Sequence, residues 1–131
     1  MIVVDSSAFI EYYRSSGLRS VQDAVANAIA ADQVAVNGVI QVEICSYASG
    51  DSERRQLEAD FQGFHWLDLG PPDFDLATDL GFQLRRLGLT IPATDLIIAA
   101  STILANARLL HRDAHFDLLA QHSKLQGFST D

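Results

Sequence analysis

The sequence predicts an α/β sandwich built around a mostly parallel sheet. Short apolar segments rich in β-branched residues alternate with stretches of helical periodicity, which is the pattern of strands joined by helical crossovers. The near-continuous apolar character of these segments is typical of strands that are buried on both faces. The 131 residues are enough for a single domain, residues 1–131, and leave little room for a second.

Each element of this fold has its own signal. Short apolar runs predict strands at Ile2–Val4, Val34–Val36 and Arg108–Leu110, with a further extended segment at 64–69. Helical spacing and capping residues predict helices beginning near Ser6 or Ser7 and then over 18–31, 39–48, 51–63, 73–87, 94–106 and 114–123. In the first helix we expect Phe9, Ile10 and Tyr13 on the inner face. The glycine and two prolines at 70–72 read as a turn, Gly88 ends the helix over 73–87, and Thr94 is expected to cap the next one.

Composition narrows the location and the class of function. No apolar run approaches the roughly 20 residues that cross a bilayer, and the N-terminus carries no signal-peptide pattern. The lone Cys45 forms neither an internal disulfide nor a cysteine-based zinc site. A cytoplasmic, reduced protein without membrane association is expected. The net charge of −8 excludes a basic clamp on nucleic acid but leaves a metal nuclease open, because bound cations reverse the local sign.

Four carboxylates stand where such a fold places its sites. Asp5 and Asp113 lie immediately beyond the C-terminal ends of two predicted strands, and open parallel sheets form their sites at that edge. Asp95 lies in the first turn of a helix predicted to be deeply buried, where the helix dipole favours negative charge. Glu43 interrupts an apolar helical run; if that helix packs on the sheet, Glu43 lies on or beside its buried face, where a glutamate requires either a partner or a raised pKa.

Each acid also has an ordinary structural interpretation. Asp5 can cap the following helix, Asp95 can complement the helix dipole, and Asp113 can be a turn residue. Asp117, one helical turn past Asp113, either reaches the same site or is solvated.

Taken together, the four acids predict a divalent metal site. Several carboxylates placed a few ångströms apart repel one another. One or two Mg²⁺ or Mn²⁺ ions remove that penalty because these hard cations prefer oxygen ligands. Such a site binds a phosphodiester oxygen and lowers the pKa of a bound water, so phosphodiester hydrolysis is the reaction that suits it best.

Four segments, in this order and spacing, carry a resemblance to a known family. They are IVVDSSA at 2–8, Val42-Glu43, TDLIIAA at 94–100, and LHRDAHF at 110–116. With these motifs the sequence resembles PIN-domain proteins over essentially its whole length, and specifically the VapC-type toxins of bacterial toxin–antitoxin pairs.

The resemblance implies a PIN-like three-layer sandwich and an endoribonuclease that depends on Mg²⁺, or on Mn²⁺ as a substitute. The substrate would be structured RNA such as tRNA or rRNA, cut by a metal-activated water. The resemblance assigns the catalytic and metal-binding roles to Asp5, Glu43, Asp95 and Asp113, with Asp5 and Asp95 as the most direct ligands. It also implies a homodimer and a VapB-type antitoxin that inserts a peptide segment, often bearing an arginine, across the acidic site.

Several neighbouring residues are candidates for supporting roles. The resemblance implies that the hydroxyls of Ser7 and Thr94 hold the acids by hydrogen bonding. Arg112, beside Asp113, is the arginine we favour for a role near the substrate. A histidine general base, His111 or His115, is a further alternative, although a metal-activated water needs none.

Two other functions remain compatible with the sequence. One is another Mg²⁺-dependent phosphohydrolase, although Ser7 stands where haloacid-dehalogenase-like enzymes carry a second aspartate. The other is a non-catalytic dimeric binding module with an acidic pocket. Only the nuclease hypothesis predicts RNA cleavage that is lost on Asp5→Asn.

Overall fold

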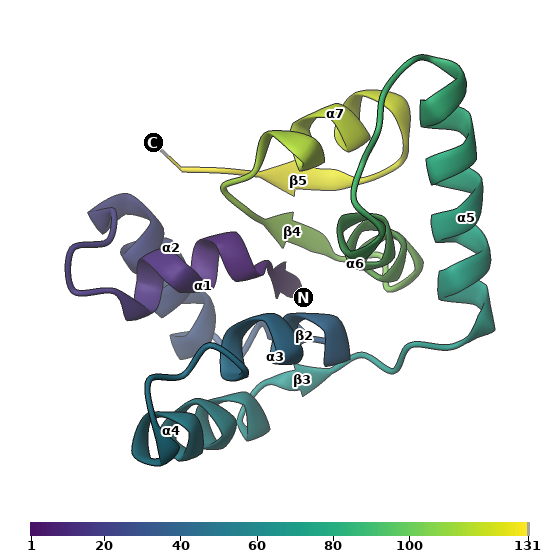
Figure 1. The fold of residues 1–131 in the computed structure, drawn as a ribbon. Coiled ribbons are helices and arrows are strands. Elements are labelled where there is room, and N and C mark those ends of the chain that lie inside the picture. Colours follow the sequence, from purple (N-terminus) through teal and green to yellow (C-terminus); the bar gives the residue numbers. More distant parts are fainter. Residues whose placement is uncertain (131) are drawn as a thin grey trace.

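A five-stranded parallel sheet forms the centre of the computed structural model, which describes residues 1–130 (Figure 1). Its strands are β1 (Ile2–Val4), β2 (Val34–Val36), β3 (His65–Trp66), β4 (Arg108–Leu110) and β5 (Gln126–Phe128), in the order β3-β2-β1-β4-β5. The central strand β1 pairs in parallel with β2 and β4. Val3 and Val4 are fully buried, as the apolar runs predicted for a strand covered on both faces.

Helices cover both faces of this sheet. They are α1 (Ser6–Tyr13), α2 (Arg19–Ala30), α3 (Gly38–Cys45), α4 (Asp51–Gln62), α5 (Pro71–Arg86), α6 (Ala93–Leu104) and α7 (Ala114–His122). The connections through α1–α4 step from β1 towards β3, whereas those through α5–α7 step back towards β5. Because parallel crossovers are right-handed, opposite steps place helices on opposite faces. Figure 1 shows α1, α2 and α4 on the opposite side of the strands from α5 and α6, in agreement with the predicted sandwich.

An aromatic cluster packs α1 against α4 and against the segment between α4 and β3. The ring of Phe9, which is fully buried, lies 5.2 Å from the ring of Phe61, 5.7 Å from that of Phe64 and 5.9 Å from that of Tyr13. The prediction that Ile10 faces inward was wrong, because its side chain is 51% exposed. Positions 9 and 10 are about 100° apart on a helix, and α1 buries only the side that carries Phe9.

Several element boundaries differ from the predicted ones. The segment 70–72 is not a free turn: both prolines lie in the first turn of α5, and the Asp73 carboxylate accepts a 2.9 Å hydrogen bond from the Gly70 N–H. Thr94 is not a cap, because α6 begins at Ala93 directly after the extended Pro92. Gly88 does end the chain's longest described helix, with a φ of +80° that suits glycine.

The two edge strands of the sheet differ from the prediction: one was not predicted, and the other is shorter than the predicted segment. Strand β5, which no sequence signal predicted, pairs with β4. The extended segment at 64–69 forms only the two-residue strand β3, whose side chains are exposed at the opposite edge. None of the described helices combines the length and apolar character that a membrane crossing requires.

Candidate active site

Asp5 occupies the centre of the carboxyl edge of the sheet. It follows β1 directly and caps α1, and its side chain is only 3% exposed. The Oδ2 atom accepts hydrogen bonds from the Ser7 backbone N–H at 3.0 Å and from the Ser7 hydroxyl at 2.6 Å. The Oδ1 atom is buried and has no hydrogen-bond partner among the described residues. A buried carboxylate oxygen without a partner is costly, so this atom fits a metal ligand.

The hydroxyl of Ser7 joins two ends of parallel strands. While donating to Asp5, it accepts a 2.9 Å hydrogen bond from the backbone N–H of Arg112, which follows β4. The same hydroxyl therefore fixes the Asp5 carboxylate and the start of the loop that carries Asp113.

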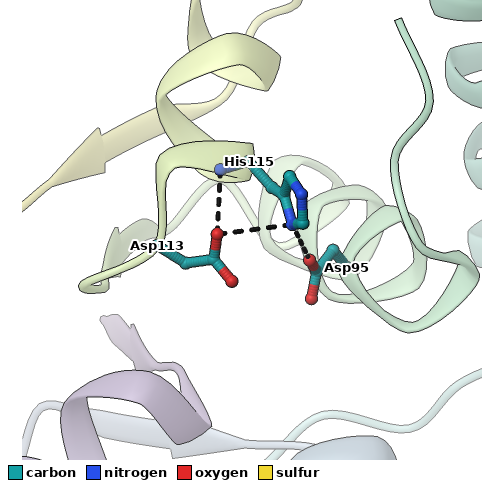
Figure 2. Close-up of side chains that lie close together, drawn as sticks. All are labelled: Asp95, Asp113 and His115. Atoms are coloured by element: carbon teal, nitrogen blue, oxygen red, sulfur yellow. Dashed lines mark hydrogen bonds and ion pairs between the residues drawn. The ribbon is translucent and has the colours of Figure 1, made fainter.

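Asp95 and Asp113 come together around His115 (Figure 2). Asp113 caps α7, and its Oδ1 atom accepts a 2.9 Å hydrogen bond from the His115 backbone N–H. The Nδ1 atom of the His115 ring lies 2.9 Å from Asp95 Oδ2 and 3.3 Å from Asp113 Oδ1. One ligand atom from each of these three residues lies within 4.8 Å of the others. The helix starts of α6 and α7 thus place two carboxylates and one imidazole at a single point.

Glu43 approaches the same edge from α3. Its Oε1 atom accepts a 3.2 Å hydrogen bond from the Ser6 hydroxyl on α1. The side chain is half-buried and opens onto a groove of about 550 Å³ between α1, α3 and α4.

The site carries an excess of uncompensated negative charge. Burial raises the pKa of Asp5, of Glu43 and of Asp95. Coulombic repulsion raises them further: Asp113 acts on all three, and Asp5 acts on both Glu43 and Asp95. The Ser7 hydrogen bonds oppose burial at Asp5, and the His115 contact opposes it at Asp95. The four predicted acids therefore form one electrostatically coupled group that a cation would stabilise.

The other predicted residues differ in whether they contact the acidic site. Ser7 lies within the site, and Arg112 reaches it through its backbone, while the exposed Arg112 side chain donates to the Thr130 carbonyl at 3.5 Å. Thr94 is exposed, and its hydroxyl makes no hydrogen bond to another residue in the range 1–130. Whether Asp117 acts with these acids stays a prediction: its side chain is 65% exposed, its Oδ1 atom lies 3.8 Å from His111 Nε2, and it lines a pocket together with Asp113.

His111 is a structural residue of the β4–β5 region. Its side chain is 1% exposed, and its Nδ1 atom accepts a 3.2 Å hydrogen bond from the Asp113 backbone N–H. Burial lowers the pKa of His111, so its neutral form is favoured. The bridging position of His115 was missed by the sequence analysis, which weighed this residue only as a general base. Its place two residues after a helix-capping aspartate, within the first turn, is the signal that could have indicated the contact.

The raised carboxylate pKa values predict how the metal-free protein responds to pH. A raised folded-state pKa contributes stability that is complete below the unfolded value of about 4 and is lost as pH rises through the folded value. Asp5, Glu43 and Asp95 all act in this direction. In EDTA we therefore expect these groups to make the protein less stable at pH 8 than at about pH 5. Melting temperatures of the wild type and of Asp5→Asn, measured across this pH range, would test this. An equal dependence of melting temperature on pH in the two proteins would contradict the prediction.

Removing the Ser7 hydroxyl is expected to weaken both fold and site. Ser7→Ala deletes a hydrogen bond to a buried carboxylate and leaves the Arg112 N–H without its acceptor. A loss of about 1–3 kcal/mol in the free energy of unfolding follows, together with a fall of roughly 10–100-fold in activity through misplacement of Asp5. Urea unfolding measures the first effect, Ser7→Thr is expected to restore both, and the exposed Ser16→Ala is the control.

Comparison with known proteins agrees with this geometry. The PIN domain family matches residues 2–121. The ribonuclease VapC11 of Mycobacterium tuberculosis is 35% identical over 132 residues, covering 98% of each chain. Solved structures at 18% identity share the fold. FitAcB from Neisseria gonorrhoeae has a TM-score of 0.78, over 98% of this chain and 96% of that one. VapBC2 from Rickettsia felis, bound to a DNA fragment from its promoter, has a TM-score of 0.76 over 100% of both chains.

The parallel α/β sandwich of this chain, with acids at its carboxyl edge, is thus a PIN fold. The chain belongs to the PIN-domain family, and within it to the VapC ribonucleases.

Proposed function

We propose that this chain is a Mg²⁺-dependent endoribonuclease that acts as the toxin of a type II toxin–antitoxin pair. The observation that carries the metal dependence is Asp5, whose buried Oδ1 atom lacks a hydrogen-bond partner while three further carboxylates raise the charge around it. The relatives named as VapC ribonucleases support RNA as the substrate class. Structured RNA such as tRNA or rRNA is the form that we infer.

Asp5, Glu43, Asp95 and Asp113 would hold the ion. Mg²⁺, or Mn²⁺ in its place, suits this set because carboxylate oxygens are its preferred ligands. When bound, the ion supplies a water of lowered pKa and neutralises charge on the scissile phosphodiester. The chain's own contribution is to keep these oxygens in place.

That placement comes from hydrogen bonds to the backbone and to serine hydroxyls. Ser7 orients Asp5 through Oδ2 and leaves Oδ1 directed into the site, while Ser6 holds Glu43. The first turn of α7 holds Asp113 through the His115 N–H. Arg112, an exposed cation at this edge, is positioned to meet an RNA phosphate.

The groove beside Glu43 is our candidate for the antitoxin segment. Its lining is largely apolar and includes Ile10, which is 51% exposed, and Tyr47, which is 86% exposed. A peptide lying there would cover two apolar side chains and end beside the acids, where an arginine finds a carboxylate partner. Structural neighbours described as VapBC complexes support a VapB-type partner, and we extend the proposal to a homodimer in the cytoplasm.

Cleavage of total cellular RNA by the purified full-length chain tests the proposal. We expect discrete fragments with Mg²⁺ or Mn²⁺ and none with EDTA, and re-addition of the ion should restore the same fragments. Cleavage that persists in EDTA would exclude the metal mechanism. A folded, antitoxin-free protein that cuts no RNA with either ion would overturn the nuclease proposal in favour of a binding module.

A further inference from the structure

His115 is the one nitrogen donor of the metal-ligand cluster found among residues 1–130. Figure 2 shows its ring lying between the carboxylates of Asp95 and Asp113, which come from different helices. The Nδ1 atom faces Asp95 Oδ2 at 2.9 Å and Asp113 Oδ1 at 3.3 Å. The ring is 40% exposed, so this position is open to ions from solvent.

These distances match the spacing of ligands around one small cation. At metal–ligand distances of about 2.1 Å, octahedral ligands in neighbouring positions lie roughly 3 Å apart and those in opposite positions roughly 4.2 Å apart. The two contacts of the imidazole, at 2.9 and 3.3 Å, lie near the first spacing, and no two of the three ligand atoms are more than 4.8 Å apart. An ion can therefore lie between the ring nitrogen and the two carboxylates.

A second feature lies beside this cluster. Asp5 is 97% buried, its Oδ1 atom is unpartnered, and its carboxylate lies close enough to that of Asp113 for the two to repel each other. The carboxylates around the ring also keep free oxygens: neither Asp95 Oδ1 nor Asp113 Oδ2 has a hydrogen-bond partner within the described residues. The imidazole thus joins a group that already has oxygens available for an ion.

We propose that His115 is a nitrogen ligand of the divalent-ion site and that it raises the affinity of the site for Mn²⁺ relative to Mg²⁺. The inference rests on the proposed metal-dependent function and adds a fifth ligand and a selectivity to it. Mg²⁺ is a hard ion that takes oxygen ligands and retains its waters. First-row transition ions accept imidazole nitrogen more readily, so replacing one oxygen by Nδ1 moves the preference towards them.

Ion-binding affinities of three variants test the selectivity. Isothermal titration calorimetry at about pH 8, where a free imidazole is neutral, would give Kd for MnCl₂ and for MgCl₂ separately. We expect the ratio of the Mg²⁺ Kd to the Mn²⁺ Kd to fall roughly tenfold in His115→Gln. It should fall at least as far in His115→Asp, which supplies oxygen instead of nitrogen. The matched control is His122→Gln, at the exposed end of the same helix, which should keep the wild-type ratio.

An equal loss of affinity for both ions in the His115 variants would overturn the inference, because it would mean that the ring only holds the carboxylates in position. Unchanged affinities for both ions in these variants would overturn it as well. Far-ultraviolet circular dichroism melts establish that each variant is folded before its affinities are compared.

Electron spin echo envelope modulation of the Mn²⁺-loaded protein tests the ligand directly. Nitrogen coupling is expected in the wild type and in His122→Gln, and it should disappear in His115→Gln. Mn²⁺ bound without nitrogen coupling, or coupling that survives His115→Gln, would overturn this inference and leave the nuclease proposal standing. A wild type that binds neither ion would instead overturn the metal-dependent function itself.

Discussion

Asp5→Asn is expected to lower the rate of RNA cleavage by roughly 1,000-fold or more. A bound ion supplies several kcal/mol of charge stabilisation in the transition state, and each 1.4 kcal/mol is a factor of ten in rate. Asparagine still caps a helix well, so the backbone hydrogen bond from Ser7 is retained while the charge is lost. Initial rates on a defined RNA fragment, with Mg²⁺ in excess, would measure the loss.

The same variant separates loss of chemistry from loss of fold. Because burial raises the pKa of Asp5, its ionised form destabilises the metal-free protein, and Asp5→Asn should melt at a higher temperature than wild type in EDTA. Asp79→Asn, the same chemical change on the exposed side of α5, should leave rate and melting temperature unchanged. Wild-type cleavage by Asp5→Asn would remove this residue from the site.

Truncation of Phe9 is expected to produce the largest loss of stability. Phe9→Ala removes a fully buried ring in contact with three other aromatic rings, a change that costs about 3–5 kcal/mol in the free energy of unfolding. Since a protein of this size is stable by only about 5–15 kcal/mol, this loss is a large share of the total stability. Urea denaturation followed by tryptophan fluorescence measures the change.

Phe82 offers the matched control for this prediction. It lies on α5 with 64% of its side chain exposed, and its only described partner is the Arg86 guanidinium, 5.8 Å from the ring centre. Phe82→Ala should cost no more than about 1 kcal/mol. Equal losses for Phe9→Ala and Phe82→Ala would contradict the central place of the aromatic cluster.

The core strands could be predicted from local sequence because they are buried on both faces. β1 and β2 consist of short apolar runs, β4 has two buried leucines after Arg108, and the observed bounds agree with the predicted ones. β5 could not be predicted in this way. Its Gln126-Gly127-Phe128 segment has a single apolar side chain, and it becomes a strand only by pairing with β4 at the edge of the sheet.

The site could be predicted as far as strand ends and helix starts determine it. The topology places Asp5 and Asp113 at the ends of adjacent parallel strands, so their proximity followed from β1 and β4 being neighbours. The contacts that depend on side-chain direction did not follow. The hydrogen bond from the Arg112 N–H to Ser7 joins residues 105 positions apart, and the ring of His115 meets Asp95 across two helices.

Two of the four carboxylates are also helix caps, and this affects how an ion would be captured. One oxygen of Asp5 is tied to the first turn of α1, and one oxygen of Asp113 to the first turn of α7. A mobile carboxylate loses rotamer entropy when it coordinates an ion, whereas these two side chains lose it when the chain folds. The ion therefore meets oxygens that are already oriented, and its arrival requires no ordering of the backbone around them.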